Sequence, residues 1–117
     1  MARSNLIRRT VLDLIEDLDH LDHRAMRAPE LHPDAAQKIQ IGARDARMGL
    51  VQVIQEIGRN PERFDTDVLL DSVHHVRRRL DHNVTIMTSH PDEVVNYVQN
   101  VNNWTLLLPG DPTTPPP

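Results

Sequence analysis

The chain has 117 residues, a length typical of one domain, with 38% hydrophobic and 3% aromatic residues and a formal net charge of −4. It contains no cysteine, which excludes disulfides, thiolate metal sites and thiol redox chemistry. The mild negative charge does not favour nucleic acid bound by bulk charge. No apolar run reaches the roughly 18 residues of a membrane span, and no signal peptide precedes the first charged residues, so we expect a cytoplasmic protein without a membrane segment. Arginine outnumbers lysine twelve to one, which we interpret as the coding bias of a bacterial or phage genome.

Apolar residues recur every three or four positions in four separate stretches, the spacing that places side chains on one face of a helix. The pattern predicts helices over residues 4–28, 33–58, 65–89 and 91–108. The predicted core faces consist of Ile7, Val11, Leu14, Leu18, Leu21, Ala25 and Ala28; of Ala36, Ile39, Ala43, Ala46, Leu50, Val53 and Ile57; of Leu69, Val73, Val76, Leu80, Asn83, Val84 and Met87; and of Val94, Tyr97, Val98, Val101, Trp104 and Leu108.

The predicted helix ends rest on capping residues and prolines. Ser4 and Asp65 are expected N-caps, and Pro33 suits the first position of the second helix. Residues 1–108 therefore form one predicted helical domain. The proline- and threonine-rich residues 109–117 are expected to be a flexible tail.

Linkers of fewer than ten residues between long helices favour antiparallel neighbours. The sequence therefore predicts an all-α, antiparallel, up-down four-helix bundle, with helix crossing angles near roughly 20°. Asn83 falls on the core face of the third helix, where a buried amide would need a partner. Two placements are open, and we favour the one in which Val84 faces inward and Asn83 is half exposed.

Small residues line one flank of the second helix at Gly42, Ala46 and Gly49. Glycine inside a helix costs about 1 kcal/mol relative to alanine, so two glycines call for a reason. Small residues three or four positions apart allow another helix to approach closely. The approaching helix belongs either to the same chain, which we favour, or to a second copy, which would make this flank a homodimer seam.

Ile41 and Met48 are seven residues apart on the side of the second helix that faces away from its core face. With the nearby Val51 they form a candidate contact patch. We therefore take Ile41, Met48 and Gly49 as candidate residues for self-association.

Seven histidines raise the question of a metal site. A carboxylate and two imidazoles share the polar face of the first helix at Glu16, His20 and His23, and a second such stripe occurs on the third helix at Asp71, His75 and His82. Metal ligands of helical bundles point inward, whereas these groups are predicted to point outward. We favour a solvated charged face, so no metal or other cofactor is expected, and a surface metal site is the alternative.

The third helix contains Arg77 and His82 with four residues between them. This spacing resembles the Arg-x(4–6)-His motif of the HEPN ribonucleases, which are small helical bundles and often dimers. The resemblance implies that Arg77 would hold phosphate and His82 would move a proton. The family usually has asparagine, aspartate or histidine after its arginine, where this chain has Arg78, and a regular helix would place the two side chains about 140° apart.

Arg77, Arg78 and Arg79 also form a candidate surface for an acidic protein partner, or pair with acids of this chain. No glycine-rich phosphate loop, HExxH motif or nucleophile elbow occurs in the sequence. The sequence therefore favours a small non-enzymatic interaction or regulatory protein that binds itself or a protein partner, as small bacterial regulators and phage-encoded inhibitors do. The HEPN-like enzyme and the metal-binding bundle are the alternatives.

Overall fold

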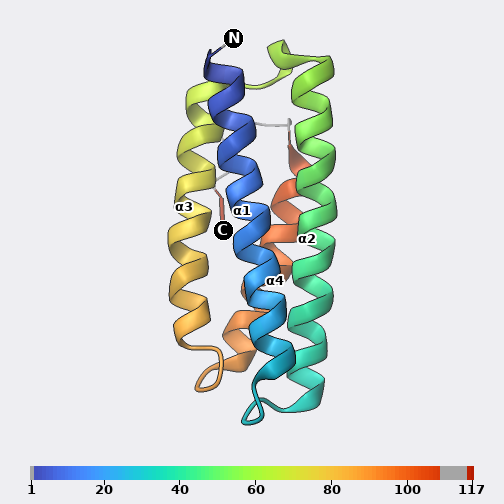
Figure 1. Ribbon diagram of the computed structural model, residues 1–117, viewed down its shortest axis with the longest axis vertical. Coiled ribbons are helices and arrows are strands. Elements are labelled where there is room, and N and C mark those ends of the chain that lie inside the picture. Colours follow the sequence, from blue (N-terminus) through green and yellow to red (C-terminus); the bar gives the residue numbers. More distant parts are fainter. Residues whose placement is uncertain (1, 109–115) are drawn as a thin grey trace.

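The computed structural model describes residues 2–108 and 116–117, without the side chains of residues 2–4. The described chain is helical, without strands, and its helices are α1 (Ala2–Arg27), α2 (Pro33–Arg59), the short 3-10 helix η1 (Pro61–Arg63), α3 (Thr66–Thr85) and α4 (Pro91–Leu107) (Figure 1). The predicted all-α, four-helix fold class is confirmed. Within residues 2–108, no helix combines the length and hydrophobicity that a membrane crossing requires. Most of the predicted tail, residues 109–115, lies outside the described residues.

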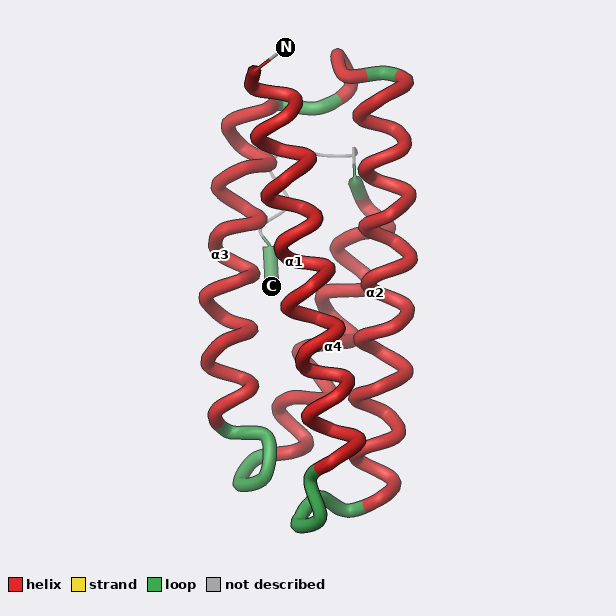
Figure 2. Tube along the Cα trace, viewed as in Figure 1, coloured by secondary structure: helices red, strands yellow, loops and turns green. Residues whose placement is uncertain are grey.

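The four long helices alternate in direction along a bundle whose extents are 45 × 23 × 19 Å. The loops between them lie at its two ends (Figure 2). Helix α1 packs against α2 and α3, and α4 packs against the same two helices. The segment through η1 therefore carries the chain across one end of the bundle, so the consecutive helices α2 and α3 lie on opposite sides (Figure 1). The expectation that short linkers join neighbouring helices holds for α1–α2 and α3–α4 and fails for α2–α3.

The core is aliphatic, as the composition requires, and the apolar faces predicted from spacing are the ones that are buried. Along α1, for example, Val11, Leu14, Leu18 and Leu21 are completely shielded from solvent. Tyr97 is one of the few aromatic side chains in this core, and its hydroxyl donates a hydrogen bond of 2.6 Å to the Val76 carbonyl of α3. Burial raises the pKa of Tyr97, so its hydroxyl remains a donor.

Helix ends agree with the prediction where a side chain caps the helix. Asp65 accepts a 3.1 Å hydrogen bond from the Val68 amide and is the N-cap of α3, as predicted. Ser4 is not an N-cap, because α1 begins at Ala2. Helix α3 ends at Thr85 and not at residue 89, and turns follow it up to His90 at the start of α4. The apolar spacing continues through Met87, so it could not reveal this end.

Asn83 and Val84 are placed opposite to the favoured prediction. Asn83 is 3% exposed, whereas Val84 is only partly buried. The Asn83 amide donates a 2.8 Å hydrogen bond to the Arg79 carbonyl one turn earlier in α3. Because a local backbone acceptor satisfies the amide, the polar side chain is tolerated inside the bundle.

The glycines of α2 allow α4 to approach closely. A Cβ atom built on Gly42 would lie 2.5 Å from Val98 Cγ2, and one built on Gly49 would lie 2.9 Å from Thr105 Cβ. Real Cβ atoms essentially never approach other atoms this closely, so a side chain at either position would force α4 or its side chains to shift. The close approach occurs within one chain, which is the alternative that we favoured, and the spacing of the glycines does not by itself indicate a homodimer.

We expect Gly49→Ala to destabilise the protein by about 2 kcal/mol, because the added methyl group would overlap the β-branched Thr105. Gly58→Ala is the matched control, since Gly58 lies in the same helix with nothing within 4 Å of an added Cβ. The control should be neutral or stabilise by up to about 1 kcal/mol. Chemical denaturation measures both free energies of unfolding. Equal values for the two variants would contradict the close approach of Thr105 to Gly49.

Candidate interaction surfaces

Helix α1 has acidic side chains on both of its flanks, and arginines of the adjacent helices bind them. On the flank toward α3, Arg77 Nε donates a 2.7 Å hydrogen bond to Asp17 Oδ2, and Arg77 Nη1 lies 3.9 Å from Asp13 Oδ2. The hydrogen bond with Asp17, helped by the charges of Asp17 and Asp13, raises the pKa of Arg77. Arg77 therefore holds α3 against α1.

On the flank toward α2, Asp22 is 3% exposed and is bound by two arginines. Its Oδ2 accepts hydrogen bonds of 3.0 Å from Arg44 Nε and 3.3 Å from Arg47 Nη2. Arg47 also donates to Asp19. The second carboxylate oxygen of Asp22 and Nε of Arg47 have no partner within the described chain.

Sequence reasoning missed this cluster, because it took the charged polar face of the first helix to be solvated. The sequence nevertheless contained a signal for this cluster. Asp22 follows directly after the core residue Leu21, and Arg44 and Arg47 each adjoin a buried alanine of α2. Charged residues at the edge of two apolar faces are well placed to pair across the helix contact.

The structure does not bring Arg77 and His82 together. Arg77 points to α1, where Asp17 and Asp13 bind it. His82 is exposed on α3 and points in a different direction, because five residues of a regular helix turn the side chain by about 140°. Arg77 and His82 therefore do not form a catalytic pair of the HEPN kind within one chain. The geometry agrees with the simpler interpretation, in which an arginine of the triplet pairs with acids of a neighbouring helix.

The candidate metal ligands are also not gathered. Within the described chain, no group of three or more histidine, aspartate or glutamate side chains could hold a metal ion, and this includes Glu16, His20 and His23. His23 Nδ1 instead lies 2.9 Å from the Asp19 carbonyl oxygen of its own helix. Glu16 and His20 are exposed.

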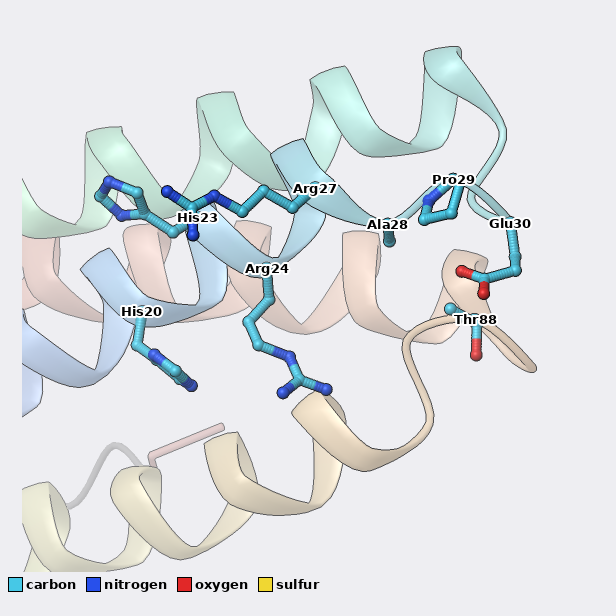
Figure 3. Close-up of a pocket in the computed structure, with 8 residues that line it drawn as sticks. All are labelled: His20, His23, Arg24, Arg27, Ala28, Pro29, Glu30 and Thr88. Atoms are coloured by element: carbon cyan, nitrogen blue, oxygen red, sulfur yellow. The ribbon is translucent and has the colours of Figure 1, made fainter.

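A basic hollow of about 610 Å³ lies at the end of α1, beside the loop between α3 and α4 (Figure 3). Its lining residues are His20, His23, Arg24, Arg27, Ala28, Pro29, Glu30 and Thr88. Arg24 and Arg27 belong to the last turn of α1, where cations stabilise the carbonyl end of a helix. Their position is thus explained without a ligand.

Three exposed apolar side chains, Ile41, Met48 and Val51, define what is called here the outer face of α2, which they share with polar residues. Their exposed fractions are 50%, 65% and 44%. Ile41 and Met48 are two turns apart and point in nearly the same direction, opposite the buried face of the helix. Gly49 does not belong to this face, because it is buried against α4.

Arg78 and Arg79 are exposed on α3, on the opposite side of the bundle from α2. Unlike Arg77, they form no ion pair within the described chain. They therefore remain available to an acidic partner, whereas Arg77 is already bound by Asp17 of α1.

Comparison with protein-family models, with curated proteins and with solved structures finds no match to this chain.

We expect Asp22→Ala to destabilise the protein by about 2 kcal/mol, because it leaves the guanidinium groups of Arg44 and Arg47 without their buried acceptor. The loss stays below that of a fully buried pair because Arg44 is 52% exposed. Asp13→Ala is the control, since Asp13 is 45% exposed and lies 3.9 Å from its arginine, beyond hydrogen-bond distance. This substitution should cost less than about 0.5 kcal/mol. Urea denaturation compares the two variants, and equal losses would show that burial of Asp22 is unimportant.

Proposed function

We propose that this chain is a small non-enzymatic interaction protein that works through protein–protein contacts and associates with a second copy of itself through the outer face of α2. The observation that carries the proposal is the exposure of Ile41 and Met48 on one line of a helix whose opposite face is already buried. Removing such side chains from water is favourable, by about 25 cal/mol per Å² of apolar surface.

The surroundings of this face support self-association. Helix α2 contacts α1 and α4 on its two sides, and α3 lies across the bundle from it, so no other long helix of the chain covers its outer face. A second copy offers the same apolar residues, and a twofold-symmetric contact covers both faces at once. The exposed Arg78 and Arg79, which lie away from this contact, would remain free for an acidic regulatory partner.

The enzymatic alternatives lack a comparable observation. Arg77 is bound to α1 while His82 faces solvent, and Glu16, His20 and His23 do not converge. No specific geometry therefore favours the HEPN-like or the metal-binding function over an interaction module.

We expect light scattering of the purified protein at micromolar concentration to give the mass of two chains. The double variant Ile41→Asp/Met48→Asp should give the mass of one chain, because it places four charges in the contact, while its helical circular dichroism should remain unchanged. Val68→Asp is the control, since Val68 is also exposed but lies on α3. A wild-type mass of one chain would refute self-association, and a double variant that still gave two chains would refute the assignment to α2.

A further inference from the structure

The outer face of α2 has a charged residue on each side of its apolar line. Arg44 and Asp45 lie between Ile41 and Met48 along the helix, and they are about 100° apart around it. The line through Ile41 and Met48 passes between them, so Arg44 is on the side toward α1 and Asp45 on the side toward α4. The contact of Arg44 with Asp22 of α1 fixes this assignment.

Two arrangements of a symmetric pair of α2 helices cover both apolar residues. In the parallel arrangement the twofold axis runs along the helices, and Ile41 and Met48 each meet the same residue of the second copy. In the antiparallel arrangement the twofold axis crosses the helices, and Ile41 of each copy meets Met48 of the other.

Of the charges on this face, Arg44 and Asp45, which flank the apolar line between Ile41 and Met48, distinguish these arrangements. A twofold axis along the helices brings the α1 side of one copy next to the α4 side of the other, so Arg44 lies beside Asp45 on both edges of the contact. A twofold axis across the helices brings equal sides together, so Arg44 lies beside Arg44 and Asp45 beside Asp45. Opposite charges that flank a helix seam stabilise an orientation and like charges disfavour it.

We infer that the second copy binds in parallel, with Arg44 and Asp45 as the residues that select this orientation; the inference rests on the proposed self-association. Arg44 can take this role while bound to Asp22. Its Nε is the atom that Asp22 binds, the side chain is 52% exposed, and its two terminal nitrogens can donate to a carboxylate of the other copy. Asp45 is exposed.

The parallel orientation also determines how the dimer presents its basic residues. Because α3 lies across the bundle from α2, the two α3 helices are at the outer edges of the pair. Arg78 and Arg79 of both copies are then at the same height along the common axis. An acidic partner with two equivalent sites would meet both copies in the same direction.

The absence of native cysteines makes the orientation directly testable. We expect Ile41→Cys and Met48→Cys, each purified alone and oxidised mildly, to form disulfide-linked dimers, because each position meets its own copy. Val68→Cys on α3 is the control and should remain unlinked. Cross-linking that appeared only when the Ile41→Cys and Met48→Cys proteins were mixed would overturn the parallel orientation and leave self-association intact. Failure of every combination, together with a single-chain mass for the wild type, would overturn both.

Charge reversal provides a second test. Asp45→Arg replaces two attractive pairs by two repulsive ones, so we expect the dimer dissociation constant to rise about tenfold. Asp71→Arg, which changes the net charge equally on the exposed surface of α3, should leave it unchanged. An unchanged or tighter dimer in Asp45→Arg would contradict the role of Asp45, and sedimentation equilibrium measures both constants.

Discussion

The arginine–carboxylate contacts on the two flanks of α1 are the interaction on which the rest of the arrangement depends. Arg77 secures α3 on one flank, and Arg44 with Arg47 secures α2 on the other. Aliphatic faces alone would tolerate several rotations of a helix, whereas a buried carboxylate such as Asp22 is tolerated only where its arginines meet it. These contacts also decide which charges stay outside. They bind Arg77 to α1, where its side chain is 33% exposed, and leave Arg78, Arg79 and Asp45 exposed.

The fold could be predicted from the sequence where the determinant is local. Apolar spacing identified the core faces of the four helices, and Asp65 was recognisable as a cap because its partner is only three residues away. The order of helices around the bundle was not predictable in this way, because it depends on pairs such as Arg77 with Asp17, which are 60 residues apart. The misplaced Asn83 has a related cause, since spacing cannot show that the Arg79 carbonyl would accept its amide.

The candidate surface on α2 was likewise predictable where helical periodicity determines it, and not where it depends on neighbouring helices. The direction of Ile41 and Met48 follows from helical periodicity alone, and both are exposed as expected. Gly49 was grouped with them because a glycine on the flank of an apolar face fits a contact with any helix. Spacing does not reveal which helix packs against Gly49, and in the structure Thr105 of the same chain packs there. Arg44 and Asp45 attracted no notice in the sequence, because their significance depends on which neighbour lies on each side of α2.

The close approach of α4 to Gly42 and Gly49 has a consequence for α4 itself. Valine and asparagine recur along α4, and both are poor helix formers. An isolated segment of 17 residues with this composition has little tendency to form a helix in water. In the bundle it packs closely against α2, where Val98 lies beside Gly42 and Thr105 lies beside Gly49. We therefore expect the helical structure of α4 to depend on its packing against α2.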